Sequence, residues 1–265
     1  MAKTLEADVI QYEVEDYVAH IWLNRPHKRN CVSAQLMQEL GEAVRRADAD
    51  PDVRVMVLRG RGNTFCSGYD LDELQDEFLK RSTSLEVAYD SAKFVDQIYT
   101  AKKPSVAVLE GYTTAGGFEI MINCDFAIAE ETALIGDFHI RRALFGGAGP
   151  IYRLPRILGL RRAKELMLTG KLLTGRQAYD WGLVNDVAPA EEIDECVERF
   201  VSELTDKSPF AVWITKMAIN QGLDADQGTL MVMEHFCSAI AMQSNDAAEG
   251  VAAFLGKREP VWTGS

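Results

Sequence analysis

Apolar and polar positions follow two different periods along this chain. Residues 9–14 and 18–23 alternate between apolar and polar side chains and are separated by Glu15 and Asp16, which predicts a β-hairpin. Further buried strands are expected at three apolar runs: residues 53–59, 105–109 and 126–129. These short runs are typical of the strands of an enclosed sheet.

Helical spacing, in which apolar residues recur every three or four positions, predicts most of the remaining elements. Leu36, Leu40 and Val44 form such a stripe behind Ser33, whose residue type caps helix N-termini. Segment 70–83 is predicted to be a polar loop. Helices are expected at residues 33–49, 85–100, 118–123, 193–205, 209–221, 227–243 and 246–255.

The order of these elements predicts the fold class and the domain organisation. Strands and helices alternate through short loops as far as about residue 190, which predicts an α/β fold. From residue 191 onward the pattern is helical. The sequence therefore predicts an α/β body over residues 1–200 and a helical region over residues 201–265.

Composition narrows the range of partners. The chain has 265 residues, of which 47% are apolar and 26% charged, and a net charge of −12. Nucleic acids and anionic membranes are recognised by basic surfaces, so neither is expected as the main partner. No apolar run approaches the length of a membrane span, and the first eight residues show no leader pattern. Five widely spaced cysteines favour reduced thiols, without a disulfide frame or zinc site, in a cytoplasmic protein.

The stretch PSVAVLEGYTTAGGFE, residues 104–119, carries the strongest chemical signal. It predicts a buried strand, a turn of small residues, and a helix with Glu119 in its first turn. Backbone N–H groups at a helix N-terminus bind anions, and here they lie beside an acid that can move protons. That combination suits a carbonyl group that becomes an oxyanion. Two structural readings stay open: Gly116 and Gly117 could serve close packing, and Glu119 could only cap its helix.

A second glycine turn lies at FCSGYDL, residues 65–71, directly after another predicted strand. Taken alone, it is typical of a tight turn with an N-cap. The turn becomes informative because the pattern is repeated: a strand and a glycine turn precede a helix here and again at residues 104–119. Two such turns lying side by side would supply two converging N–H groups.

Eight motifs together resemble those of the crotonase superfamily, the enoyl-CoA hydratases and isomerases. The matching segments, in chain order, are residues 23–30 (LNRPHKRN), 65–71, 111–119 (GYTTAGGFE), 124–129 (CDFAIA), 146–149 (GGAG), 168–170 (LTG), 181–185 (WGLVN) and 249–258 (EGVAAFLGKR). They run in order over nearly the whole chain. The resemblance implies a spiral of ββα turns, a C-terminal helical trimerisation region, and a homotrimer or dimer of trimers.

The same resemblance implies an acyl-CoA thioester as the ligand and assigns roles to three residues. The backbone N–H groups of Tyr69 and Gly116 would hold the thioester oxygen, and Glu119 matches the first catalytic glutamate of the hydratases. The second glutamate is absent, since His139 stands at its position with Asp137 two residues earlier. Histidine suits acid–base work near neutral pH, although it could also only fill the pocket.

Further residues are candidates for holding the ligand. Coenzyme A binding is implied for Lys28, Arg29 and Asn30 near the start of the chain and for Phe254 and Lys257 near its end. Lysine at a helix end is otherwise a common solvated complement to the helix dipole. The acyl-pocket candidates are Asp137, Arg141 and Gly147, although Arg141 could also simply lie on the surface. The acyl channel is expected to be shaped by Tyr89, Phe94 and loop 72–84. No metal and no cofactor is expected beyond the coenzyme A of the substrate.

Hydration of a 2-enoyl-CoA is the first functional hypothesis, with Glu119 as the main acid–base group and His139 assisting. Isomerisation of the double bond needs only Glu119 as a single base. Hydrolysis of a C–C or thioester bond by Glu119 and His139 is a third possibility. A protein that binds acyl-CoA without turnover is the alternative outside catalysis, because the second glutamate is missing.

Overall fold

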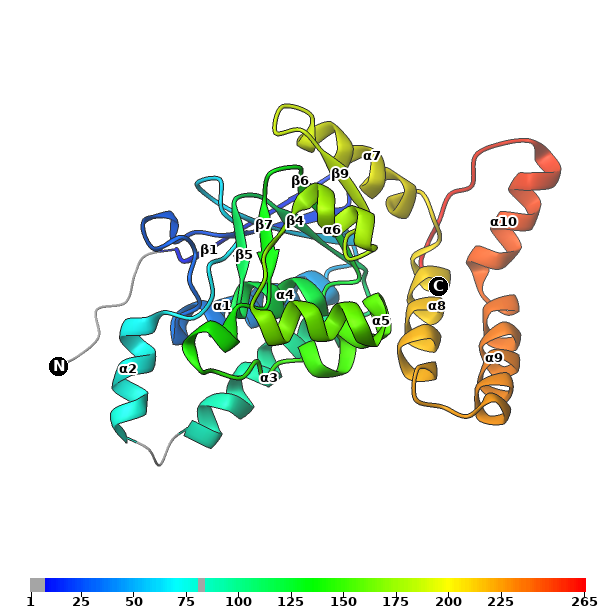
Figure 1. The fold of residues 1–265 in the computed structure, drawn as a ribbon. Coiled ribbons are helices and arrows are strands. Elements are labelled where there is room, and N and C mark those ends of the chain that lie inside the picture. Colours follow the sequence, from blue (N-terminus) through cyan, green and yellow to red (C-terminus); the bar gives the residue numbers. More distant parts are fainter. Residues whose placement is uncertain (1–7, 81–83) are drawn as a thin grey trace.

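The computed structural model describes residues 8–80 and 84–265, and their side chains except those of residues 76–80 and 84–91. The first eight residues, in which the sequence shows no leader pattern, lie outside this range except for residue 8. A six-stranded sheet forms the centre of the molecule (Figure 1). Its strands, in spatial order, are β1 (Ile10–Glu15), β2 (Val18–Leu23), β3 (Val55–Gly60), β4 (Ser105–Leu109), β6 (Phe126–Glu130) and β9 (Asp186–Ala188). The β1–β2 pair is antiparallel and the other pairs are parallel, which confirms the predicted hairpin and the α/β class.

A second, three-stranded sheet lies beside the first. It consists of β5 (Tyr112–Thr114), β7 (Leu134–Gly136) and β8 (Leu173–Thr174). The sequence predicts none of these strands, because two or three residues are too few for a period to appear. Strand β5 lies inside the stretch predicted as a turn of small residues.

Helices cover the sheet and extend beyond it. They are α1 (Ala34–Ala49), α2 (Leu71–Lys80), α3 (Ser84–Thr100), α4 (Gly116–Asn123), α5 (Pro150–Thr169), α6 (Gly175–Trp181), α7 (Ile193–Thr205), α8 (Pro209–Gly222), α9 (Gln227–Met242) and α10 (Asn245–Gly256), with short 3-10 turns η1 (Pro26–Lys28) and η2 (His139–Arg142). Helix α2 contradicts the predicted loop at 70–83. Leu71, Leu74 and Phe78 recur at helical spacing in the sequence, and Asp70, just before the helix, accepts a hydrogen bond from the Asp72 N–H at 3.2 Å, as an N-cap residue does. None of the described helices is long and apolar enough to cross a membrane.

Strand β3 shows how the sheet divides the core into two layers. Met56 and Leu58 join the large cluster that α1, α3 and α4 cover. Val55 and Val57 point to the other face and pack with α7. Because side chains alternate along a strand, one apolar run supplies both layers.

The C-terminal helices leave this core. Helix α7 runs across the predicted boundary at residue 200, and Val201 is still buried in the second core layer. Helices α8, α9 and α10 lie to one side of the sheet (Figure 1). The division into regions 1–200 and 201–265 stays a prediction, while the helical character of the second region is confirmed.

Candidate active site

The two glycine turns lie side by side, as the sequence predicts. The Cys66 N–H donates to the carbonyl of Tyr112 at 2.9 Å, and the Thr114 N–H donates to the carbonyl of Cys66 at 3.0 Å. Gly68 has a φ of 109°, a left-handed conformation that favours glycine, and a Cβ there would lie 3.6 Å from the nitrogen of Gly116. The start of α4 therefore lies beside the turn that precedes α2.

Close packing explains both glycines at the start of α4. A Cβ on Gly116 would lie 2.8 Å from Cε2 of Tyr69, and a Cβ on Gly117 would lie 2.2 Å from the carbonyl oxygen of Cys66. Gly116 is also the first residue of the helix, so its N–H has no carbonyl partner within α4. Packing and anion binding are thus compatible at this position. The oxyanion roles of Tyr69 and Gly116 stay predictions.

Glu119 is buried, with 1% of its surface exposed, and its carboxylate contacts two groups from outside its helix. Oε2 accepts from the Tyr69 hydroxyl at 3.1 Å, and Oε1 accepts from the Ala148 N–H at 3.0 Å. It does not cap α4, whose N-cap residue is Ala115. Burial raises the pKa of Glu119, although His139 and the two donors oppose the shift. A carboxyl group with a raised pKa is suited to acid–base work near neutral pH.

His139 and Asp137 form a buried pair next to Glu119. The Nδ1 of His139 bonds Oδ1 of Asp137, which leaves Nε2 for proton transfer. Burial would lower the pKa of His139, but the bond to Asp137 and the charge of Glu119 outweigh it and raise that pKa. The result is an imidazole that takes up a proton more readily than a free histidine.

Gly146 closes this cluster. A Cβ atom on Gly146 would lie 3.1 Å from Nδ1 of His139 and 3.2 Å from Oδ1 of Asp137. The same atom would lie 3.2 Å from Oε1 of Glu119. The three acid–base side chains therefore converge on one backbone position, and only a residue without a side chain fits there without displacing one of them.

Gly146→Ala is expected to lower turnover by roughly 10-fold or more, because a displacement of a few tenths of an ångström at three reacting groups is costly. Gly147→Ala is the matched control, since nothing lies within 4 Å of a Cβ at that exposed position. Steady-state rates of the two variants, with thermal unfolding to compare their stability, check this. Equal rates would contradict the geometry.

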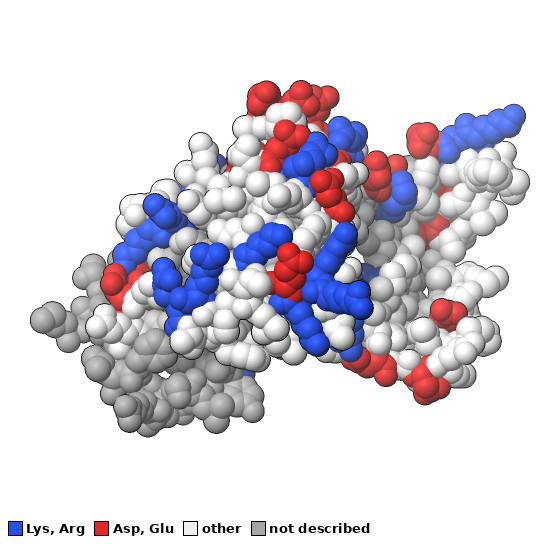
Figure 2. Space-filling model, viewed as in Figure 1, with Lys and Arg blue, Asp and Glu red and all other residues white. Residues whose placement is uncertain are grey.

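The cluster opens into two cavities that meet at His139 and Leu144. One, of about 620 Å³, has a polar rim that includes Lys28, Arg29 and Tyr69. The other, of about 330 Å³, is mainly apolar and lies between η2 and α5. Although the chain is acidic overall, Lys and Arg side chains gather on the face that carries α5 (Figure 2). A polar arm and an apolar tail could thus be held on opposite sides of the acid–base groups.

A family model described as enoyl-CoA hydratase/isomerase matches residues 13–265. The chain belongs to this family. The whole fold is also similar to that of a solved structure: the crystal structure of an enoyl-CoA hydratase from Bacillus anthracis superimposes with a TM-score of 0.90 at 31% identity, covering 97% of this chain and 99% of that one. The predicted crotonase fold and the recognition of the superfamily are confirmed.

Two curated relatives of this enoyl-CoA hydratase/isomerase family member show the range of names within the family. The enoyl-CoA isomerase/hydratase fer4 of Mycosarcoma maydis is 32% identical over 256 residues, covering 93% of each chain. The mitochondrial enoyl-CoA hydratase domain-containing protein 2 of Homo sapiens is 34% identical over 259 residues, covering 93% of this chain and 86% of the relative. The protein is therefore an enzyme of the enoyl-CoA hydratase/isomerase type.

The predicted coenzyme A residues of this family member fall into separate groups. Lys28 and Arg29 line the larger cavity, where Lys28 is paired with Asp70 at 2.9 Å. Asn30 is fully buried, and its side chain bonds the backbone of Arg61 and Thr64, so it shapes the loop and does not reach the cavity.

Phe254 and Lys257 lie on and just after α10, away from the two cavities that meet at His139 (Figure 1). Phe254 is 82% exposed. Within one chain, these two residues are not brought to the acid–base cluster.

The acyl-pocket candidates also divide. Asp137 lines the apolar cavity, whereas Arg141 and Gly147 do not. Arg141 donates from Nε to the carbonyl of Gly170 at 2.9 Å on the surface. Phe94 is 4% exposed and packs in the main core, and the prediction that it shapes a channel stays a prediction. The side chain of Tyr89 lies outside the described residues.

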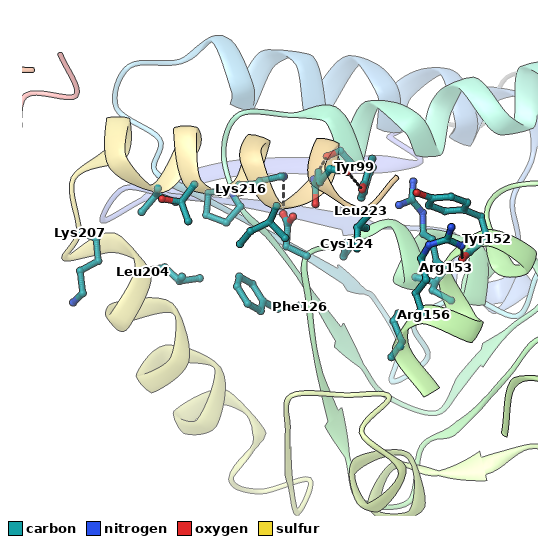
Figure 3. Close-up of a pocket in the computed structure, with 18 of the residues that line it drawn as sticks. Tyr99, Cys124, Phe126, Tyr152, Arg153, Arg156, Leu204, Lys207, Lys216 and Leu223 are labelled. Carbon is teal, nitrogen blue, oxygen red and sulfur yellow. Dashed lines mark hydrogen bonds and ion pairs between the residues drawn. The ribbon is translucent and has the colours of Figure 1, made fainter. Parts of the chain in front are cut away.

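A third cavity, of about 590 Å³, lies between α8 and the core (Figure 3). Its lining includes Tyr99, Arg153 and Lys216, and none of the residues predicted for the site. The Nζ of Lys216 bonds Oδ2 of Asp125 at 2.7 Å, and neither of these residues lines the two cavities that meet at His139.

Three contributors to the site were missed at the level of sequence. The Tyr69 hydroxyl, the Ala148 N–H and the position of Gly146 all act on Glu119 or its neighbours. The motif at 146–149 was recognised as a turn into a helix, but nothing in its spacing relates it to Glu119. The only hint of the contact between the Tyr69 hydroxyl and Glu119 was the presence of a tyrosine in the turn 65–71.

Proposed function

We propose that this enzyme adds water across the C2=C3 double bond of a 2-enoyl-CoA. The observation that carries the proposal is the cluster of Glu119 with the His139–Asp137 pair, two acid–base groups around one small volume. Hydration needs two such groups, because one proton leaves water while another reaches carbon. Relatives named as hydratases and isomerases are compatible with the proposal.

Glu119, ionised, takes a proton from water while the water oxygen bonds C3 and the π electrons move onto the thioester oxygen. The backbone N–H groups of Tyr69 and Gly116 stabilise that oxyanion, each contributing about 3 kcal/mol. Protonated His139 then delivers a proton to C2 as the carbonyl reforms. Return of a proton from Glu119 to His139 restores the starting state.

Asp137 supports this division of labour. It holds Nδ1 of His139 and favours the protonated imidazole, so His139 is the proton donor. The apolar cavity beyond it, about 330 Å³ in volume, is proposed to take the acyl tail. The larger cavity, with Lys28 and Arg29, is proposed to take the coenzyme A arm. The proposal calls for coenzyme A as part of the substrate and for no separate cofactor or metal.

His139→Ala is expected to slow the hydration of crotonyl-CoA by about 10²- to 10³-fold, since the proton donor is lost. His235→Ala, at an exposed histidine of α9, is the matched control and should keep the wild-type rate. The measurement is the loss of enoyl absorbance with time. Unchanged hydration in His139→Ala would sink the assisting role.

Isomerisation is the second candidate, because both oxygens of Glu119 are held by donors, Tyr69 and Ala148, as for a single base. A proton would leave C4 and return at C2 on the same carboxylate. The 3-enoyl-CoA test substrate separates the two reactions: an isomerase retains activity in His139→Ala. Hydrolysis is the third, since the Asp137–His139 pair could activate water for attack on a carbonyl.

We also propose that the chain assembles as a homotrimer or a dimer of trimers in the cytoplasm. Large apolar side chains are exposed on the C-terminal helices, among them Phe236, Ile240, Met242 and Leu255. Exposed apolar surface of this kind marks interaction sites. Sedimentation equilibrium tests the assembly, and a monomer at micromolar concentration would contradict it.

A further inference from the structure

The predicted oxyanion role of Tyr69 uses only its backbone and does not explain the position of its side chain. Its predicted contribution is the backbone N–H, for which any residue but proline would serve. Yet the ring lies against Gly116, where a Cβ would be 2.8 Å from Cε2, and the hydroxyl reaches Oε2 of Glu119 at 3.1 Å. The phenol thus links the first glycine turn to the acid–base group on the second.

The surroundings of Glu119 make this contact consequential. Its carboxylate is buried, and its two donors are the Ala148 N–H and the Tyr69 hydroxyl, one on each oxygen. The other titratable groups that act on it are His139, Asp137 and the thiol of Cys66. The amide belongs to the backbone, so the phenol is the side-chain donor that fixes the second oxygen.

We propose that Tyr69 is a positioning residue: its hydroxyl donates to Oε2 and holds Glu119 in the ionised, oriented form that acts as a base. The inference rests on the proposed function, because it concerns the ionisation of the group that the proposed reaction uses. A donor to a carboxylate stabilises the charged form. Burial, which opposes ionisation, is offset at this one oxygen by the phenol.

The chain offers a clean variant. Tyr69→Phe keeps the backbone N–H and the ring against Gly116, and removes only the oxygen. Loss of the donor should raise the pKa of Glu119, so the acidic limb of the kcat profile should move to higher pH by about one unit. The sign follows because a base is active only when ionised, and a higher pKa delays ionisation as pH rises. Tyr179→Phe is the matched control, since Tyr179 is exposed on α6 and should leave the limb in place.

A second readout needs no substrate. Carbon-13 NMR of protein labelled at the glutamate carboxyl carbon, with the Glu119 signal assigned from Glu119→Gln, follows its titration directly in the wild type and in Tyr69→Phe. Circular dichroism and thermal unfolding, recorded first, show whether Tyr69→Phe is folded, and Tyr69→Leu provides a second variant without the hydroxyl. An upward shift of the Glu119 titration in these variants is expected.

The two readouts separate the failure of this inference from the failure of the proposed function. If acyl-CoA thioesters are not turned over but the Glu119 titration still moves in Tyr69→Phe, the reaction is wrong and the role of the phenol stands. An unchanged or lowered titration in Tyr69→Phe overturns the inference, whatever the reaction.

Discussion

Glu119→Gln is expected to lower the turnover of acyl-CoA substrates by about 10²- to 10⁴-fold, because the amide cannot exchange protons. The substitution preserves size: the one amide oxygen can accept from the Ala148 N–H, and the amide NH2 can donate to the Tyr69 hydroxyl, which then serves as the acceptor. It also removes a group whose charged form is disfavoured by burial. The thermal unfolding temperature should therefore not fall, and the loss should appear in kcat.

The control for this variant is Glu165→Gln, at a half-exposed glutamate that pairs with Lys171 on the surface. It should keep the wild-type kcat. A Glu119→Gln variant with wild-type kcat on every substrate that the wild type turns over would remove Glu119 from the mechanism.

Asp70→Asn is expected to have the largest effect on stability, about 3–5 kcal/mol of unfolding free energy, because it removes the carboxylate from a buried ion pair. Nη2 of Arg25 lies 3.0 Å from Oδ2 of Asp70, and both side chains are under 5% exposed. The same two segments are joined by the backbone, since Val32 N–H donates to the Gly68 carbonyl at 2.7 Å. The pair therefore also holds the turn that contains Tyr69, and kcat should fall with stability.

Asp125→Asn provides the matched comparison, because Asp125 and Lys216 form a mostly buried pair that lines the cavity in Figure 3 and neither of the two cavities that meet at His139. This variant should lose stability and keep the kcat of the folded enzyme. Urea unfolding and initial rates measure both quantities. Loss of kcat in Asp125→Asn to the same extent as in Asp70→Asn would show that destabilisation alone accounts for the effect.

The contribution of Asp70 should depend on pH. Burial would raise the pKa of Asp70, but hydrogen bonds from Lys28 and Arg25 lower it to about 2, below the ordinary value of 3.8. A lowered native pKa stabilises the fold above the ordinary value, and the gain is lost as pH falls through 2. The difference in stability between wild type and Asp70→Asn should thus be constant above about pH 5 and shrink below pH 4.

Much of the fold could be predicted, because long apolar periods determine its main elements. Strand β4 and helix α7 were predicted with their observed limits, and Ser33 caps α1 through a bond from the Leu36 N–H. Helix α2 was missed because its charged residues outnumber its apolar ones and resemble those of a solvated loop. The second sheet was missed because its strands are held by neighbours in space, which local sequence does not reveal.

The candidate site was predictable in part for the same reason. Glycine turns and a buried acid leave local signatures, so the two turns and Glu119 could be singled out from the residues, whereas the roles of Gly116 and His139 followed only from the resemblance to the crotonase superfamily. The contacts of Tyr69 and Ala148 with Glu119 span 50 and 29 residues of sequence, and only the folded chain reveals them. Phe254 and Lys257 have no place in the cluster within one chain.

Exchange of the C2 protons of saturated acyl-CoA thioesters with deuterium oxide tests the central claim most directly, because it requires a base and a stabilised enolate but neither hydration nor isomerisation. Proton NMR of the thioester should show exchange with the wild-type enzyme and with Glu165→Gln. With Glu119→Gln, the exchange rate should be lower by about 10²-fold or more. Equal exchange by the wild type and Glu119→Gln would contradict the account.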